Sequence, residues 1–319
     1  MRVVFVGSSE FSLKCLDLIS SLESIDLVGV ITNPSTFAIS YSNAPVTNCL
    51  HSDLVAWSSE RDVCCYQLNT KMNSPHLLEW VLDKAPDLFL VVGWYHLVPQ
   101  SLRDIAPAIG LHASLLPDYS GGAPLVWAII NGEQKTGITL FKMDSGVDSG
   151  PIIGQAEEVI LPSDTIRSLY DRIEKKGLQL LVKYLPIISS GKVEYQQQDS
   201  ARRRIFPQRS PADGLINCRL DAWSIDRFIR AQTKPYPGAY LELNDGSRLT
   251  IWEALPVSAT YQGLNSSFVS RDSELILPCS SGSLLLKHVT FNGQDFYPDS
   301  ISAELGPIIS DLSINPSQI

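Results

Sequence analysis

Two short segments of the chain hold residue types that are suited to acid–base chemistry. Residues 110–124, GLHASLLPDYSGGAP, place His112 among small residues, and residues 143–153, MDSGVDSGPII, place Asp144 and Asp148 in a glycine-rich stretch. A carboxylate beside a histidine orients the ring and increases its basicity, which suits proton transfer near neutral pH. The two segments therefore indicate a His–Asp pair if the fold brings them together.

The same residues also have a purely structural interpretation. A histidine at the end of a strand can bond to a backbone carbonyl, and an aspartate between glycines is common in turns. Spacing alone leaves both interpretations open for His112 and Asp148. The elements that position these residues therefore matter.

The first 190 residues alternate strand and helix patterns. The chain begins with a strand–helix–strand unit, which implies a parallel sheet. The unit consists of a β-branched strand at 2–7, a helical stripe after the possible N-caps Ser8 and Ser9, and a strand at 26–32. Further strands are predicted at 64–68, 87–94 and 136–144. Further helices are predicted at 76–85, 123–132 and 165–188, and a turn with a short helix at 97–108. The stretch 33–70 is polar and irregular.

Both chemical segments follow strand-like runs. In open parallel sheets, ligands bind beyond the carboxyl ends of the strands. We therefore expect His112 and Asp148 to meet at this edge of the sheet.

The pattern changes after residue 190. A polar stretch at 195–214, with Pro207 and Pro211, predicts a linker. A helix at 224–233 and strands at 239–243, 248–254, 273–279 and 283–291, separated by NDGS and SSGS turns, predict a small β-rich barrel. We therefore expect a catalytic domain over 1–192, a linker over 193–212, a β-rich domain over 213–305 and a tail over 306–319.

The bulk composition limits the class of protein. The 319 residues are 44% hydrophobic and 18% charged, which suits a soluble protein of two domains. No apolar run reaches the roughly 18–20 residues of a membrane helix, and the start of the chain does not resemble a signal peptide. The net charge of −9 argues against tight nucleic-acid binding, although a local basic patch can still bind phosphates. The six cysteines lack C-x-x-C spacing, so we expect reduced thiols in a cytoplasmic protein and no metal site.

The motifs together resemble a known enzyme family. The chain reads H-x-S-L-L-P from His112, then G-x-x-P, then G-I-T-L-x-x-M-D-x-G-x-D-x-G-P-I. This pattern resembles the formyltransferases that use 10-formyltetrahydrofolate, which include methionyl-tRNA formyltransferase, glycinamide ribonucleotide transformylase and the sugar-nucleotide N-formyltransferases. The resemblance covers nearly the whole chain: residues 91–99 lie where the family holds the folate ring, and FPQRSPADG from residue 206 looks like the start of an OB-like domain. It implies a Rossmann-like α/β domain with a mostly parallel sheet, followed by a small OB-like domain.

The resemblance implies a catalytic Asn, His and Asp. The His falls on His112 and the Asp on Asp148, but the Asn position holds Gly110. In the implied reaction an amine attacks the formyl carbon of the folate donor. His112 would stabilise the oxyanion or give a proton to the leaving nitrogen, and Asp148 would keep His112 charged and accept the amine proton. Loss of an oxyanion donor costs roughly 10²–10³ in rate in other enzymes, about 2.7–4 kcal/mol.

Three explanations of Gly110 are open. Another donor replaces the Asn, with Ser114 and nearby backbone N–H groups as candidates; the enzyme is slow; or its chemistry has diverged. We favour the first explanation, because His112 and Asp148 occur together with the folate-side segment.

The resemblance also assigns binding residues. Backbone groups of two segments would hold the folate, and the matching residues are Trp94, Tyr95, His96, Leu97, Asp144, Gly146 and Val147. Trp94 could equally be core, and we interpret His96 as a loop residue rather than a second base. The candidate acceptor-side residues are Ser8, Ser9, Phe11, Tyr119, Gly121 and Gly122.

The acceptor amine is the least determined part of the prediction. Residues 33–69 hold one Lys or Arg, Arg61, and the family's R-Y-R-G is replaced by D-Y-S-G at 118–121. With the net charge, this argues against tRNA as the acceptor, and we interpret Arg202, Arg203 and Arg204 as a solvated linker or an interdomain anchor. The leading expectation is formylation of a small amine. The best-supported acceptor of this kind is an amino sugar that is attached to a nucleotide. The alternatives are a methionyl-tRNA formyltransferase and a weakly active or non-catalytic folate-binding homologue.

Overall fold

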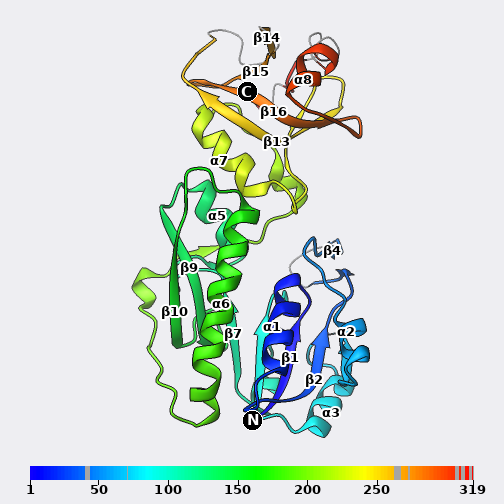
Figure 1. The fold of residues 1–319 in the computed structure, drawn as a ribbon, viewed down its shortest axis with the longest axis vertical. Helices are drawn as coiled ribbons and strands as arrows, with labels where there is room; N and C mark the ends of the chain where they lie inside the picture. The colour runs from blue at the N-terminus through cyan, green and yellow to red at the C-terminus, as the bar shows by residue number, and fades with distance from the viewer. Residues whose placement is uncertain are drawn as a thin grey trace. The chain divides into compact units, whose positions relative to one another are not determined.

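The chain divides into two units (Figure 1). The structure is a computed structural model that describes residues 1–39, 44–69, 71–261, 267–271, 274–305, 309, 313–315 and 318. The first unit comprises Met1–Pro124, Thr136–Val159 and Asp171–Phe206, and the second comprises Leu125–Lys135, Ile160–Tyr170 and Pro207–Ile319. Each unit therefore combines segments that are distant in the sequence.

The first unit is built on a mostly parallel sheet with the strand order β10-β9-β7-β6-β1-β2-β5. β1 pairs in parallel with β2 and β6, β2 with β5, and β6 with β7, whereas β9 runs antiparallel to β7. This arrangement confirms the predicted Rossmann-like fold class. The strands are β1 (Arg2–Gly7), β2 (Asp26–Thr32), β5 (Cys65–Gln67), β6 (Leu88–Val92), β7 (Ala108–His112), β9 (Lys135–Lys142) and β10 (Ile152–Val159).

One face of the sheet packs against two helices that follow β5 and β6. Strand alternation sends Val4 and Val6 of β1 to this face, where they share a core cluster with Leu77, Val81 and Leu102. The helices of this unit are α1 (Glu10–Ser20), α2 (Leu54–Glu60), α3 (Pro75–Lys84), α4 (Gln100–Arg103) and α6 (Ile166–Ser189), the last of which continues from the second unit. Leu77 and Val81 belong to α3, and Leu102 belongs to α4.

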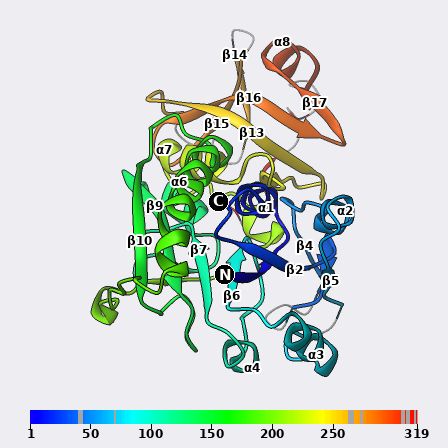
Figure 2. The same cartoon turned by 60° about the horizontal axis from the view of Figure 1, so that its bottom comes forward.

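Helices α1 and α6 lie side by side, away from α3 and α4 (Figure 2). A Cβ on Gly177 of α6 would lie 2.6 Å from Phe11 of α1 and 2.8 Å from Ile138 of β9, so glycine permits this close approach. Lys14 and Glu174 join the two helices through an ion pair of 2.6 Å. The helices thus form the second covering layer of the sheet.

The first helix begins as its sequence predicts. Ser9 is the N-cap of α1 and accepts a hydrogen bond from the backbone N–H of Ser12, and the two serines form a capping box. Cys15, Leu16 and Ile19 make the buried stripe of the helix. Of the two predicted caps, Ser9 therefore takes the role.

Two parts of the first unit differ from the sequence prediction. The stretch 33–70 is more regular than expected, because it contains the short strands β3 (Thr36–Phe37) and β4 (Val46–Thr47) and the helix α2, whose N-cap is Asp53. β10 was not predicted, because it follows directly on a glycine-rich loop and only its first three residues are continuously buried. A run of that length gives a weak strand signal.

The second unit is β-rich after its helical segments. Its sheet has the order β12-β13-β16-β15-β14, with β17 beside β16, and every recorded pair is antiparallel. Ile225 and Ile229 of α7 pack on Leu241 and Ile251 of this sheet. The fold confirms the predicted β-rich C-terminal part. The elements are α5 (Pro124–Ile130), α7 (Ala222–Gln232), β12 (Ala239–Glu242), β13 (Arg248–Val257), β14 (Val269–Arg271), β15 (Glu274–Pro278), β16 (Ser283–Phe291), β17 (Gln294–Phe296), α8 (Pro298–Ser300) and a π-helical turn, Ile301–Leu305.

The predicted tail at 306–319 lies mostly outside the described residues. Gln318, which is described, bonds through its side-chain amide to the carbonyl of Glu242 at 3.1 Å. All six cysteines are free thiols in the structure. Within the described residues, no helix combines the length and apolar character needed to cross a bilayer.

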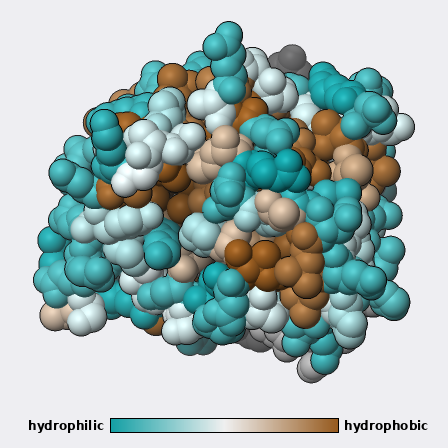
Figure 3. Space-filling view, turned by 90° about the horizontal axis from the view of Figure 1, so that it is seen from below, coloured by the Kyte–Doolittle hydropathy of each residue, from teal (hydrophilic) through white to brown (hydrophobic). Residues whose placement is uncertain are grey.

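Apolar side chains also reach the surface in small areas between hydrophilic groups, as the face in Figure 3 shows.

Candidate active site

The fold of the first unit brings His112 and Asp148 together. His112 is the last residue of β7, and Asp148 lies in the loop that joins β9 to β10. Nδ1 of His112 lies 3.6 Å from Oδ2 of Asp148, and Nε2 lies 2.8 Å from the carbonyl oxygen of Tyr119. Both ring nitrogens therefore face acceptor oxygens. The imidazolium form, with an N–H at each nitrogen, meets both acceptors.

Asp148 is held in an unusual backbone conformation. Its φ is +51°, in the left-handed region that Asp adopts more readily than most residues. Oδ2 of Asp148 accepts a hydrogen bond of 2.8 Å from the N–H of Gly121. The side-chain amide of Gln198 donates to the carbonyl oxygens of Asp148 and Gly150 at 2.8 Å and 2.6 Å. The carboxylate thus connects the loop after β7 with the loop after β9.

The loop after β7 pairs with a segment from the end of the first unit. β8 (Ser120–Gly121) runs parallel to β11 (Ile205–Phe206), and the N–H of Gly122 donates to the carbonyl of Phe206 at 2.9 Å. Gly121 has φ +94°, and a Cβ there would lie 2.4 Å from the carbonyl oxygen of Phe206. Glycine is therefore required at this contact.

Side chains reinforce the same contact. Arg204 donates from Nε and Nη2 to the two carboxylate oxygens of Asp118. Its guanidinium also lies 4.8 Å from the ring centre of Tyr119, and the rings of Tyr119 and Phe206 stack with centres 4.4 Å apart. These contacts fix Tyr119, whose φ is +54° and whose carbonyl accepts from His112.

Gly110 lies two residues before His112, inside the sheet. It pairs with Val91 of β6 on one side and with Phe141 of β9 on the other. A Cβ at this position would lie 2.4 Å from Cε of Met143. The side chain of Met143 therefore fills the space into which an asparagine at 110 would extend.

Ser114 is fully buried, and its hydroxyl donates to the carbonyl of Asp118 at 2.7 Å. Its own carbonyl accepts from the hydroxyl of Thr139 at 2.6 Å. The one proton of the Ser114 hydroxyl is thus used within the loop. In this arrangement the serine gives rigidity to the loop after His112.

The predicted folate segment after β6 contains unsatisfied polar atoms. Nε1 of Trp94 and Nε2 of His96 are buried and find no hydrogen-bond partner among the described residues. Burial lowers the pKa of His96. Tyr95 donates its hydroxyl to Oδ1 of Asn48 at 3.1 Å, and Leu97 is 68% exposed. The segment thus combines buried polar atoms with an exposed apolar side chain.

The second predicted folate segment is the loop after β9. Oδ1 of Asp144 accepts from the N–H of Gly146 at 2.9 Å and from the hydroxyl of Ser149 at 2.7 Å, which closes a tight turn. Val147 is 39% exposed, and its carbonyl accepts from the guanidinium of Arg203. This loop is ordered by its own side chains and by Arg203.

The predicted acceptor-side residues near α1 are mostly engaged in the fold. Ser8 is fully buried, and its hydroxyl donates a hydrogen bond of 3.4 Å to the carbonyl oxygen of Gly93. Ser9 caps α1, and Phe11 lies against Gly177. Tyr119 and Gly121 instead contact the His–Asp pair directly, at His112 and at Asp148, and Gly122 bonds to the carbonyl of Phe206.

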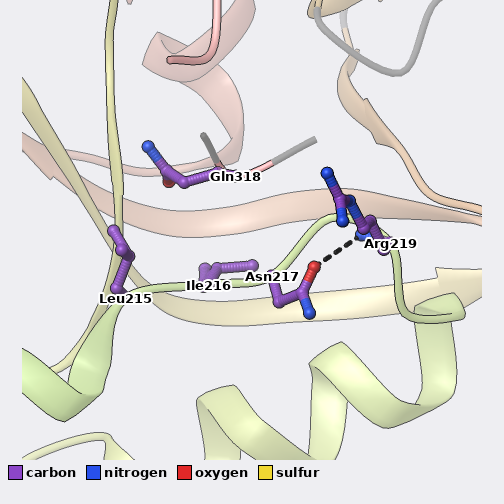
Figure 4. A pocket seen from close by; sticks show the side chains of 5 residues that line it. All are labelled: Leu215, Ile216, Asn217, Arg219 and Gln318. Carbon is purple, nitrogen blue, oxygen red and sulfur yellow. Dashed lines mark hydrogen bonds between the residues drawn. The ribbon is translucent and has the colours of Figure 1, made fainter. Parts of the chain in front are cut away.

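A separate pocket lies in the second unit (Figure 4). The N–H of Arg219 donates to Oδ1 of Asn217 at 3.0 Å in its wall. The residues that line the pocket include no acidic side chain next to a basic one. They are Leu215, Ile216, Asn217, Arg219 and Gln318. Among the described residues there is also no group of three or more potential metal ligands.

Sequence reasoning missed four contributors to the candidate site. Met143 fills the space beside Gly110, Gln198 and Arg203 bond to the loop after β9, and Arg204 bonds to the loop after β7. The run of three arginines was a visible signal. Its partners were not, because they lie in loops far away in the sequence.

Comparison with known proteins identifies the class of enzyme. The family model described as "Formyl transferase" matches residues 1–185, and the model "Formyl transferase, C-terminal domain" matches residues 209–298. The chain belongs to the formyl transferase family. It is a formyltransferase.

Relatives of two kinds resemble this chain. The methionyl-tRNA formyltransferase of Geobacter sulfurreducens is 31% identical over 301 residues, which cover 93% of this chain and 92% of the relative. That of Geotalea uraniireducens is 32% identical over 297 residues, covering 92% and 91%. Among solved structures, the sugar 3N-formyl transferase WlaRD, described with dTDP and 5-N-formyl-THF, has a TM-score of 0.64 at 18% identity and covers 92% of this chain and 98% of its own. An N-formyltransferase from Helicobacter canadensis in complex with folinic acid and dTDP-3-aminofucose also has a TM-score of 0.64 at 18% identity, covering 93% and 100%. These structures share the fold.

The prediction against tRNA as an acceptor is wrong. Methionyl-tRNA formyltransferases about 31% identical to this chain over most of its length make tRNA a plausible acceptor. The net charge was a poor guide to the acceptor, because it averages over the whole chain and does not show local positive charge. Arg203 and Arg204, interpreted from sequence as linker residues, contact the two loops that carry the candidate site.

Proposed function

We propose that this chain transfers a formyl group to a primary amine with His112 and Asp148 as its catalytic residues. The observation that carries the proposal is the juxtaposition of Nδ1 of His112 and Oδ2 of Asp148 at 3.6 Å, in side chains that are 11% and 20% exposed. Such partial burial strengthens their interaction and leaves one edge of the pair open to reactants.

The two side chains divide the proton movements of the reaction. As the amine nitrogen bonds to the formyl carbon and the bond from that carbon to the folate nitrogen breaks, one proton leaves the amine and one reaches the folate nitrogen. Asp148, as the carboxylate, accepts the first, directly or through water. His112, as the imidazolium, supplies the second or donates a hydrogen bond to the developing oxyanion. Because both N–H groups of His112 are engaged with Asp148 and Tyr119, one of these contacts opens during turnover.

The segment after β6 fits a folate donor. The buried Nε1 of Trp94 and Nε2 of His96 have unused hydrogen-bonding capacity, which the polar edge of a bound ring can satisfy. Trp94 and Met143 pack against the core cluster that contains Val98, and they offer an apolar wall. A bound formyl-folate supplies the activated one-carbon unit, and these residues would hold it beside His112.

Two acceptor classes have support. The amino group of a methionyl-tRNA is supported by the curated relatives, which match over most of their length. An amino sugar on a nucleotide is supported by structural neighbours whose descriptions include dTDP or dTDP-3-aminofucose. Both are primary amines attached to phosphate-bearing molecules, so both suit the same His–Asp chemistry.

The experiment measures formyl transfer from 10-formyltetrahydrofolate to methionyl-tRNA and to a set of dTDP-amino sugars, using wild type, His112→Ala and Asp148→Asn. We expect the wild type to act on one class and each variant to lose at least about a hundredfold in rate. His76→Ala, an exposed histidine of α3, is the matched control. Wild-type rates in a folded His112→Ala or Asp148→Asn protein would overturn the proposed roles.

Binding of the donor is tested separately. Calorimetric titration with 5-formyltetrahydrofolate, which resembles the donor but is stable, should give saturable binding in wild type and in His112→Ala. Loss of binding in Trp94→Ala, with unchanged binding in His76→Ala, would support the assigned folate segment. Unchanged binding in Trp94→Ala would exclude Trp94 from that segment.

A further inference from the structure

The segment from residue 196 to residue 206 crosses both loops of the candidate site, and we call it the strap. At its start, Gln196 forms a bridge with Ile152, with hydrogen bonds of 2.8 Å in both directions. At its end, β11 pairs with β8. Between these points it reaches the loop after β9 through Gln198 and Arg203, and the loop after β7 through Arg204. The strap therefore contacts the supports of both His112 and Asp148.

Gln198 is the strap residue closest in bonding to a catalytic group. Its Nε2 donates to the carbonyl oxygens of Asp148 and Gly150, so its two N–H bonds hold both ends of a three-residue turn. Asp148 at the start of that turn has φ +51°, a conformation that needs support from its surroundings. Oε1 of Gln198 is buried without a partner among the described residues. The side-chain amide therefore bonds to this turn only through the two hydrogen bonds that its Nε2 donates.

Arg204 supports the other half of the pair in a similar way. Its backbone carbonyl accepts from the N–H of Ser120 at 3.0 Å, and its side chain bonds Asp118, so both parts of the residue bracket Tyr119. The carbonyl of Tyr119 accepts from Nε2 of His112. The strap thus constrains His112 from one side and Asp148 from the other.

We propose that the strap is a positioning element of formyl transfer, in which Gln198 sets the orientation of Asp148 toward His112. The proposal rests on the proposed roles of His112 and Asp148. Gln198 acts on Asp148 through the backbone of the turn, so it is a positioning residue. Misplacement of a catalytic group by about 1 Å can cost about a hundredfold in rate, so loss of this support should be visible in kcat.

The test compares Gln198→Leu with Gln197→Leu. Leucine keeps the approximate size of glutamine but removes both donors, and Gln197 is the exposed neighbour of the same type. We expect Gln198→Leu to lower kcat by about tenfold to a hundredfold, with less than threefold change in KM for the donor, and Gln197→Leu to match wild type. Gln198→Glu should lose more activity, because a carboxylate would face two carbonyl oxygens.

A second readout does not depend on the acceptor. The chain has five histidines, so the NMR signal of the His112 ring can be assigned from its absence in His112→Ala. We expect Gln198→Leu to move this signal at constant pH, because the carboxylate beside the ring is displaced, and Gln197→Leu to leave it in place. A merely structural role would lower the melting temperature without moving the His112 signal or kcat.

The outcomes separate the two levels of inference. If His112→Ala is inactive and Gln198→Leu equals Gln197→Leu in kcat and in the His112 signal, the strap inference is overturned and the proposed function stands. If His112→Ala retains wild-type activity, the pair is not catalytic and both fail. Selective loss in Gln198→Leu and Gln198→Glu supports both.

Discussion

Gly110 lies so close to Met143 that a Cβ on residue 110 would be 2.4 Å from Cε of the methionine. The resemblance to the formyltransferases implies an asparagine at this position. In this chain the terminal methyl of Met143 takes up the space into which that side chain would extend. The glycine and the methionine therefore form a matched pair, in which a flexible side chain replaces a polar one.

We predict that Gly110→Asn alone lowers stability by about 1–3 kcal/mol, because Met143 must move from a packed position. Met143→Ala removes the main obstruction to the asparagine and leaves the carbonyl oxygen of Val91, 3.2 Å from its Cβ, to be accommodated by a small shift. The asparagine amide then becomes available as a donor beside His112. The double variant should exceed the wild-type kcat by about tenfold or more, if one oxyanion donor has its usual effect. Chemical denaturation and formyl-transfer kinetics measure the two effects.

Met143→Ala alone is the control for the double variant. It creates space without adding a donor, so its kcat should not rise. A double variant that folds well but turns over no faster than Met143→Ala would show that residue 110 does not face the reacting atoms.

The ion pair between Arg204 and Asp118 should contribute more to activity than to stability. The two side chains are 51% and 35% exposed, and exposed ion pairs contribute only about 0–1 kcal/mol to folding. Removing Arg204 also removes the cation over Tyr119, whose carbonyl holds His112. We expect Arg204→Ala to lower kcat by about threefold to tenfold, with a small change in unfolding free energy.

A double-mutant cycle gives the sharper result. Arg204→Ala and Asp118→Ala should be less than additive in kcat, because each removes the same contact. Fully additive effects would mean that the two residues act independently of each other.

Gly121→Ala should destabilise the protein more than Gly191→Ala. Both glycines have positive φ, at +94° and +70°, so alanine is strained at either position. A Cβ on Gly191 has nothing within 4 Å, whereas one on Gly121 would lie 2.4 Å from the carbonyl oxygen of Phe206. We expect about 1 kcal/mol for Gly191→Ala and at least about 2 kcal/mol for Gly121→Ala, measured by urea unfolding.

Gly121→Ala should also impair formyl transfer, because the N–H of residue 121 donates to Asp148. Equal stability losses for the two variants would contradict the close β8–β11 contact. Equal activity would contradict the link from that contact to Asp148.

The stability of the protein should depend on the protonation of His96. Burial lowers the pKa of His96 in the folded state below its unfolded value of about 6.5, so the unfolded chain binds the proton more tightly. Stability from this residue is therefore full above pH 6.5 and is lost as the pH falls below it. His96→Phe, which removes the titration and keeps an aromatic ring beside Phe37, should show a smaller loss of unfolding free energy between pH 7.5 and 5.5. An identical pH dependence in the two proteins would exclude this effect.

Local patterns in the sequence predicted most of the elements, because strand and helix periodicity is a property of neighbouring residues. The strand at 2–7, the capped helix after it and the long helix at 165–188 appear in the structure as β1, α1 and α6. β9 runs antiparallel to β7, contrary to the expectation that both strands end at one edge, and Asp148 reaches His112 through the loop that follows β9. The family motifs predicted which side chains lie at the candidate site. α2 and β10 were missed, because each follows an irregular or glycine-rich stretch that gives little periodic signal.

The supports of the site could not be predicted in this way. Arg204 and Asp118 are 86 positions apart, and the strands that join their segments, β11 and β8, are two residues long. A two-residue strand has no detectable period, and a glutamine that bonds two carbonyls, as Gln198 does, has no sequence signature. Net charge failed for a related reason, since it does not report which loops the arginines contact.

The pairing of β11 with β8 also bears on how such enzymes can be recombined. Phe206 is the last residue of the first unit, and it lies well beyond the long helix α6, where a boundary would be drawn from helix and strand patterns alone. A hybrid joined directly after α6 would take Gln198, Arg204 and Phe206 from the other parent. A hybrid joined after Phe206 would inherit the catalytic loops with the residues that shape them, but it would divide the second unit, because Leu125–Lys135 and Ile160–Tyr170 would stay with the first parent.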